Sequence, residues 1–267
     1  MRGRIVNRFT HGIVAMLLVG AAAAAARAGE LAPSGTLRAT FIAANPVQAT
    51  IDPATGEVRG PAADLVRELA RRQGIPFTIA GVPTVQAVIE SVKTGAADIG
   101  FVAFDPVRAV EVDFSQPYSL AHNTYLVLAG SPIRSVADVD RPGIRIGVGA
   151  RDAGDYFLTR TLKHAEIRRN PTGALSEALR MLTAGEIDAY AANRQRLTAV
   201  ASQQPGLRVL PDNFYGVEQA IIVAKGHPAR LEILDRFIEE ARGAGFIRAA
   251  IERAGLVGVD VAPPRAR

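Results

Sequence analysis

An arginine just beyond a buried strand is the residue whose type and position point most directly to chemistry. Within residues 94–130 an apolar strand begins at Ala97, and Arg108 follows it closely. A guanidinium presents a rigid fork of donors that matches a carboxylate and stays charged at physiological pH. We therefore expect Arg108 to hold a small anion in a cleft. The alternative is an ion pair with Asp105 or Glu111, which are both close in sequence.

A second anion contact is predicted where the segment GVGARDAGDYFLT passes from a strand to a helix. The helix is expected to start at Asp152 or Ala153, next to Arg151. Unpaired backbone amides at a helix N-terminus, together with the helix dipole, favour an anion. Asp152 could instead be the N-cap residue, and its carboxylate would then compete for the same amides. Arg151 could line the cleft or be a solvated surface charge.

Strands and helices alternate along the chain and would position these groups. A strand over 36–43, a helix over 61–73, a strand over 77–79 and a helix that ends at Gly95 form a first run. A second run begins near Ile144 and repeats this order. The phrases VKTGAADIGF and LTAGEIDAYA are alike and lie 90 residues apart. The pattern predicts an α/β fold of two similar lobes, each with a parallel sheet flanked by helices.

The N-terminus predicts a secretory signal peptide over residues 1–28. Three early arginines precede an apolar run over 13–26, and the run ends in the small-x-small triplet Ala26-Arg27-Ala28. The apolar run has 14 residues, whereas a membrane-spanning helix needs roughly 20. We therefore expect the signal to be cleaved and the mature protein to be released into the periplasm.

Charge and composition narrow the possible functions. The chain has 31 basic and 26 acidic residues, and removing the four arginines of the signal peptide leaves 27 against 26. A nearly neutral mature protein has no basic field for nucleic-acid binding. The absence of cysteine excludes disulfides, thiolate metal sites and a lipid-modified cysteine. The histidines have no metal-type spacing with acids, so we expect neither a metal nor a cofactor.

The residues around Arg108 resemble the family 3 solute-binding proteins, which are the periplasmic receptors of amino-acid ABC importers. VIESVKTG, ADIGFVA, DPVR and FSQPY reproduce the helix, glycine, buried strand, arginine and Phe-Ser-x-Pro-Tyr phrase of that family's first lobe. The resemblance extends from Gly35 to about Leu256. It implies a type II periplasmic-binding-protein fold, in which two parallel-sheet lobes are joined by two crossing strands. The implied boundaries are 29–125 and 221–256 for a discontinuous lobe 1, 126–220 for lobe 2, and 257–267 for a frayed, flexible tail.

The resemblance also implies roles for residues in the cleft. In this family the counterpart of Arg108 holds the ligand carboxylate, and an acid of lobe 2 pairs with the ligand ammonium. The position matching this acid is Asn193, in GEIDAYAANRQRL. A neutral amide supplies no charge, and a desolvated cation without an anion is unfavourable. This departure argues against an ordinary zwitterionic amino acid as the ligand.

The lobe 1 side of the expected site departs from the family as well. The loop after the first strand commonly reads aromatic-Pro-Pro-Phe, whereas this chain has Asn45-Pro46-Val47-Gln48. We expect Asn45 and Gln48 to contact polar groups of the ligand. Phe101 and Phe104 could form an apolar wall, although a phenylalanine on or beside a buried strand is more often a core residue. Ala103, at the end of the same strand, is expected in the site with them.

These features together imply a monomeric receptor without catalytic residues, which captures a small organic anion or amino-acid-like solute by hinge closure. Its partner would be an ABC permease in the inner membrane. Two alternatives remain open. Some proteins resembling this family are lyases of small cyclic carboxylates, and Glu218 and Asp152 are the acids that could take part here. A receptor that reports to a sensor or chemoreceptor would have the same sequence features.

Overall fold

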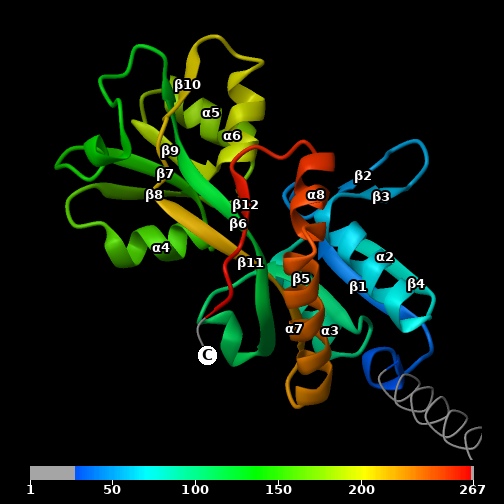
Figure 1. Cartoon of the computed structure of the whole chain (residues 1–267). Coiled ribbons are helices and arrows are strands. Elements are labelled where there is room, and N and C mark those ends of the chain that lie inside the picture. Colours follow the sequence, from blue (N-terminus) through cyan, green and yellow to red (C-terminus); the bar gives the residue numbers. More distant parts are fainter. Residues whose placement is uncertain (1–27, 266–267) are drawn as a thin grey trace, which may run out of the picture.

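The computed structural model describes residues 28–265, which form two lobes of strands and helices (Figure 1). The expected signal peptide lies outside the described residues except for Ala28, so its cleavage stays a prediction. Within residues 28–265, no helix has both the length and the apolar character that crossing a membrane requires.

Lobe 1 is a parallel sheet covered by helices. Its central strand β1 pairs in parallel with both β4 and β5. A short hairpin of β2 (Thr50–Ile51) and β3 (Val58–Arg59) precedes the first long helix. The main elements are β1 (Leu37–Ile42), α2 (Pro61–Gln73), β4 (Phe77–Val82), α3 (Val85–Lys93), β5 (Ile99–Ala103), α7 (Pro228–Gly243) and α8 (Phe246–Arg253).

Lobe 2 repeats this arrangement. Its central strand β7 pairs in parallel with both β8 and β9. A short turn, η2 (Val136–Asp138), leads into the lobe. The remaining elements are β7 (Arg145–Gly149), α4 (Ala153–Thr161), β8 (Glu166–Asn170), α5 (Leu175–Thr183), β9 (Ala189–Asn193), α6 (Arg194–Ala201) and β10 (Leu207–Val209).

Two long strands cross between the lobes. β6 (Val112–Leu128) and β11 (Tyr215–Ala224) are antiparallel to each other. β11 also pairs with β5 of lobe 1, and β6 pairs with β9 of lobe 2. The sheet therefore runs through both lobes in the order β4-β1-β5-β11-β6-β9-β7-β8. This is the predicted two-lobed α/β architecture with two crossing strands.

Local sequence explains why the helices form where they do. Helix α2 starts with Pro61 at its first position and stops at Gly74, which adopts a left-handed conformation with φ of 65°. Its residues Leu65, Val66 and Leu69 are at most 1% exposed and pack in the lobe 1 core. The i, i+1, i+4 spacing of these apolar residues places them on one face, and this face covers the sheet.

The C-terminal segment, for which the sequence predicted a frayed tail, contains a paired strand. β12 (Val259–Val261) pairs antiparallel with residues 119–121 of β6. Farther along, the Arg265 backbone amide donates to Gln116 Oε1 at 2.7 Å, and the Arg265 guanidinium pairs with Glu218 on β11. The segment is held because the crossing strands offer it backbone and side-chain partners. Residues 266–267 lie outside the described range.

Candidate ligand-binding cleft

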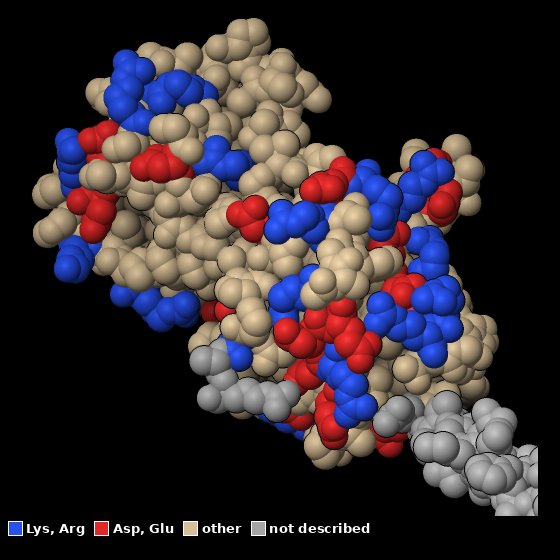
Figure 2. All heavy atoms as spheres, viewed as in Figure 1, with Lys and Arg blue, Asp and Glu red and all other residues tan. Residues whose placement is uncertain are grey.

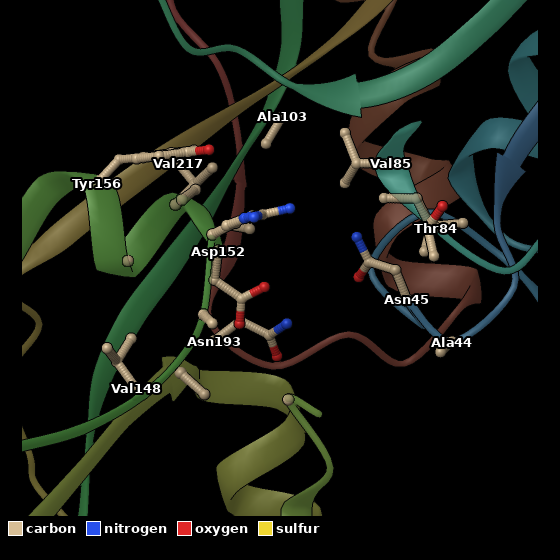
Figure 3. A pocket seen from close by; sticks show the side chains of 18 of the residues that line it. Ala44, Asn45, Thr84, Val85, Ala103, Val148, Asp152, Tyr156, Asn193 and Val217 are labelled. Atoms are coloured by element: carbon tan, nitrogen blue, oxygen red, sulfur yellow. The ribbon is translucent and has the colours of Figure 1, made fainter. Parts of the chain in front are cut away.

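A cavity of about 760 Å³ has walls from both lobes. Asn45, Thr84 and Val85 come from lobe 1, and Asp152 and Asn193 come from lobe 2. Figure 3 shows these two groups facing each other across open space. Both walls are formed by loops and helix starts that follow the carboxyl ends of the parallel strands, the usual place for ligands in open α/β sheets.

Arg108 begins the short helix η1 (Arg108–Val110), shortly after β5, and lines the cavity. The residue is only 8% exposed, and its Nη1 donates to the Ala103 carbonyl oxygen at 2.8 Å. Its guanidinium carbon lies 6.0 Å from the ring centre of Tyr156 on α4. Burial lowers the pKa of the Arg108 guanidinium from its usual value. The protein therefore holds a cation here that water does not fully solvate.

The local ion pairs that Arg108 could have made are occupied by other groups. The Asp105 carboxylate accepts from the Val107 amide at 2.9 Å and lies 3.6 Å from Arg160. Glu111 pairs with Lys93 at 2.9 Å. No acid among residues 28–265 forms an ion pair with Arg108. A buried guanidinium without an ion-pair partner remains available to an anion in the cavity.

The start of α4 faces the same cavity because of an unusual turn before it. Arg151 has a φ of 63°, the left-handed region, and is the one non-glycine residue of 28–265 with a positive φ. Its amide donates to Asp155 Oδ2 at 2.9 Å, and this carboxylate is also held by Arg169 at 3.0 Å. The turn leaves the amides of Ala153 and Gly154 without an acceptor among the described residues. These amides are suitable donors for an anion.

Asp152 lies directly before α4, but its side chain does not cap the helix. Within residues 28–265 its carboxylate accepts no hydrogen bond, and Figure 3 shows it pointing into the cavity beside Asn193. The carboxylate lies close over Gly149, where an added Cβ would collide with it. Partial desolvation by the surrounding protein raises the pKa of Asp152, although attraction from Arg196 and Arg108 partly offsets this effect. The Asp152 carboxylate is thus open to the cavity and exposed, with protein groups around it that shift its pKa.

Asn193 ends β9 and serves as the N-cap of α6. Its Oδ1 accepts from the Arg196 amide at 2.9 Å, which satisfies one of the free donors at the helix start. Its Nδ2 donates to no other described residue and borders the cavity. Asn193 can therefore offer hydrogen-bond donors to a ligand while its oxygen holds the helix.

The structure brings most of the expected site residues together. Arg108, Asn45, Ala103, Arg151, Asp152, Ala153 and Asn193 all line the cavity. Asn45 Oδ1 accepts from the Val47 amide at 3.3 Å, so this side chain shapes its own loop. Arg151 is exposed, whereas Arg196, which also lines the cavity, donates to the Gly173 carbonyl oxygen at 3.1 Å.

Three expected residues lie away from the cavity. Gln48 is fully buried, where its Oε1 accepts from the Ile42 amide at 3.0 Å and its Nε2 donates to Gln219 Oε1 at 3.2 Å. Phe101 is fully buried in the lobe 1 core. Phe104 packs edge-on against Phe114 and is covered by Arg265. Core packing and, for Gln48, internal hydrogen bonds explain why these side chains do not line the cavity.

The sequence analysis did not select other residues that line the cavity, including Asn123 on β6, Tyr156 and Gln219. Tyr156 could have been found, because it follows Asp152 by one helical turn and must lie on the same side of α4. Asn123 and Gln219 come from the crossing strands, and their pairing with the lobes fixes which way they point. No local spacing in the sequence reveals that pairing.

Comparison with known proteins gives the family. Residues 39–254 match the model of the bacterial extracellular solute-binding proteins, family 3. The chain belongs to this family. It is 26% identical, over 71% of its length and 74% of the relative's, to a probable histidine-binding protein of Campylobacter jejuni. The resemblance seen in the sequence is thereby confirmed.

Solved structures support the same fold. An amino acid ABC transporter substrate-binding protein of Streptococcus pneumoniae bound to L-arginine matches with a TM-score of 0.68 at 19% identity, over 87% of this chain and 99% of that one. An ancestral amino acid-binding protein, a precursor of cyclohexadienyl dehydratase, matches with a TM-score of 0.66 at 24% identity, over 84% and 96%. These likenesses confirm the type II periplasmic-binding-protein fold.

Proposed function

We propose that the protein is a periplasmic receptor that captures a small carboxylate-bearing solute between its lobes and delivers it to an ABC permease. The proposal rests mainly on the observation that Arg108 is buried in the cavity and has no ion-pair partner among residues 28–265. The opposite wall presents the unpaired amides of Ala153 and Gly154. A carboxylate could accept from both walls at once, which would hold the lobes together.

Hinge closure would couple ligand binding to the change from an open to a closed arrangement of the two lobes. The solute would contact Arg108 in lobe 1 and the α4 amides in lobe 2 together only when the lobes approach each other, so binding would favour the closed state. Each factor of ten in relative affinity for that state contributes about 1.4 kcal/mol to closure. We propose that a monomer acts in this way, since each of its two lobes supplies one side of the site.

A binding role agrees better with the site than catalysis does. Glu218, one of the two acids that could serve as an acid or base, is paired with Arg265 and is not among the cavity-lining residues. Asp152 remains in the cavity, but no other carboxylate and no histidine of lobe 2 is among the residues that line it. The family and the named relative are binding proteins. We therefore propose that the protein has no enzymatic activity.

A thermal-shift screen of amino acids, hydroxy acids and other small carboxylates tests the proposal, because a ligand that binds the folded state raises its melting temperature. Replacing Arg108 with Ala should weaken binding of each hit by about 2 to 5 kcal/mol, as expected for loss of a buried charge contact. Calorimetry measures that change. Unchanged affinity in the Arg108→Ala variant would contradict the proposed role of Arg108.

The control for this experiment is Arg168→Ala. Arg168 lies on β8 of lobe 2, is half exposed and pairs with Glu166 outside the cavity. Affinity should be unchanged in this variant. The melting temperature of ligand-free Arg108→Ala should not fall, because burial already disfavours the charged form of that side chain.

Delivery to a permease is tested in cells. Deleting the gene should abolish uptake of the labelled solute, and the intact gene, but not the Arg108→Ala form, should restore it. Normal uptake after deletion, with a lost chemotactic or signalling response to the same solute, would favour the sensor alternative. Sequencing the N-terminus of the exported protein tests cleavage before Gly29.

A further inference from the structure

Asp152 is the feature of the cleft that capture of a carboxylate alone does not explain. It is an acid in a cavity proposed to receive an anion, and two anions held close together in one cavity repel each other. Its carboxylate neither caps α4 nor accepts a hydrogen bond from any residue of 28–265. Gly149 leaves the space into which this carboxylate fits, since a Cβ there would collide with it. The structure thus accommodates an acid that serves no visible internal role.

Other acids near the cavity are already neutralised. Glu111 borders the cavity but pairs with Lys93 at 2.9 Å, and Asp105 pairs with Arg160 at 3.6 Å. Asp155 is held by Arg169. Asp152 is therefore the one acid lining the cavity, within the described range, that makes no ion pair. Figure 3 shows its side chain next to Asn193, on the wall opposite Asn45.

We propose that Asp152 provides the counter-charge for the ammonium group of an amino acid, so that the ligand is a zwitterion with its carboxylate on Arg108. The proposal rests on the proposed function of the cleft. In the resembled family the acid for the ammonium aligns with Asn193, and here the acid would come instead from the start of α4. Asn193 lies beside it and supplies a neutral amide. The ligand ammonium would then face the one cavity-lining acid of residues 28–265 that makes no ion pair, and the ligand carboxylate would face the buried Arg108.

The alternative role for Asp152 is a protonated acid that donates to the ligand carboxylate. The groups that face Asp152 are Arg108 from η1, Arg196 from α6, Asp155 from α4 and Tyr190 from β9. The two roles predict opposite pH dependence. A carboxylate that binds an ammonium loses affinity as the pH falls through its pKa, whereas a protonated donor gains affinity over the same range.

The experiment compares amino acids with the hydroxy acids that differ from them only in the ammonium group. The probes are L-alanine and L-lactate, L-aspartate and L-malate, L-phenylalanine and L-phenyllactate, and L-histidine and imidazole-lactate, measured by calorimetry. The wild-type protein should bind the amino acid of at least one pair tenfold or more tightly than its hydroxy acid. Asp152→Asn should remove this preference and leave hydroxy-acid binding unchanged or stronger, because repulsion of the carboxylate is lost.

Equal binding of both members of every pair that binds, or a preference that survives Asp152→Asn, would overturn the role of Asp152 while leaving the receptor function intact. Affinity that rises as the pH is lowered would overturn it in favour of the protonated donor. Binding of none of the eight acids would contradict the proposed function itself, and this inference with it.

Two further variants test whether a changed ligand preference in Asp152→Asn comes from the lost charge and not from impaired folding. Asp113→Asn changes a carboxylate that pairs with Lys225 outside the cavity, and it should leave the ligand preference unchanged. In the double variant Asp152→Asn with Asn193→Asp, the acid returns to the position that the family resemblance assigns. The amino-acid preference should reappear there, and a double variant that binds no better than Asp152→Asn would count against the proposal.

Discussion

Each lobe contains an equivalent arginine–aspartate pair, called the brace below, but the two lobes carry different groups in the cleft. In lobe 1, Asp98 accepts from the Arg38 amide at 2.8 Å and pairs with its guanidinium at 2.8 Å. In lobe 2, Asp188 accepts from the Arg145 amide at 2.8 Å and pairs with its guanidinium at 2.9 Å. The repeated sequence phrase therefore encodes a link between the first and third strands of each sheet. It does not encode a binding residue.

The functional difference comes from the loops beyond these strands. After β5 the chain places Arg108, a buried cation, in the cavity. At the end of β9 it places Asn193, a neutral amide, and the α4 wall adds free amides and Asp152. Repeated strands hold the two walls in similar positions, while the loops are free to diverge. The comparison suggests that stability depends on the shared brace and specificity on the differing loops.

The largest expected effect separates the two braces. The Asp98 side chain is 2% exposed and that of Asp188 is 31% exposed. Asp98→Ala should lower the free energy of unfolding by about 3 kcal/mol, because it removes a buried carboxylate that accepts from both the amide and the guanidinium of Arg38. Asp188→Ala should lower it by about 1 kcal/mol, because water replaces part of the lost contact. Urea unfolding measures both, and equal losses would mean that burial does not distinguish the braces.

The Asp188 brace also predicts a pH dependence. Burial alone would raise the pKa of Asp188, but hydrogen bonds from Arg145 hold it below its ordinary value. A lowered carboxyl pKa contributes stability that is present above about pH 4 and is lost as the pH falls further. The stability difference between wild type and Asp188→Ala should therefore shrink in acid. A constant difference between pH 7 and pH 3 would contradict this assignment.

A proline at the start of α4 tests the lobe 2 anion contact. α2 and α7 begin with Pro61 and Pro228, so this fold accepts proline at a first helical position. Ala153→Pro removes one free amide and should weaken ligand binding by about 1 to 3 kcal/mol. Ala153→Gly keeps the amide and is the matched control. Calorimetry that shows equal affinity for the two variants would exclude this amide from the site.

Asn193 should affect stability and binding separately. Asn193→Ala removes the N-cap of α6 and should lower the free energy of unfolding by about 1 kcal/mol. Asn193→Asp keeps a good capping group and should unfold at the same denaturant concentration as the wild type. If both substitutions destabilise equally, capping is not the structural role of this side chain.

The smallest expected effect concerns a contact between the lobes. Arg160 on α4 lies 3.6 Å from Asp105, which follows β5, and its side chain is half exposed. Arg160→Ala should weaken closure by less than about 1 kcal/mol, since partly exposed pairs contribute little. Small-angle scattering of the ligand-free and ligand-bound protein measures closure, with Arg160→Lys as the charge-retaining control. A large shift toward the open form would show that this pair contributes more than its exposure suggests.

Much of the fold was predictable from the sequence, and the site was predictable in part. The apolar spacing of α2 and α3 and their flanking signals, such as Pro61 and Gly95, are local features that mark helices directly. Arg108 was recognised because a strand, an arginine and an aromatic phrase follow one another in the chain. Asn123 and Gln219 were not, since the pairing of the crossing strands that turns them toward the cavity joins separate segments.

The sequence by itself determined the alternating elements, the repeated brace phrase and the arginine for an anion, because each is set by residues within a few positions of one another. Only the tertiary structure decided that Gln48 is buried against Gln219, that the C-terminal segment pairs with β6, and that Asp152 faces the cavity instead of capping its helix. Those outcomes depend on which distant segments pack together and on which polar groups this packing buries or leaves open to the cavity. Neighbours along the chain do not determine that packing.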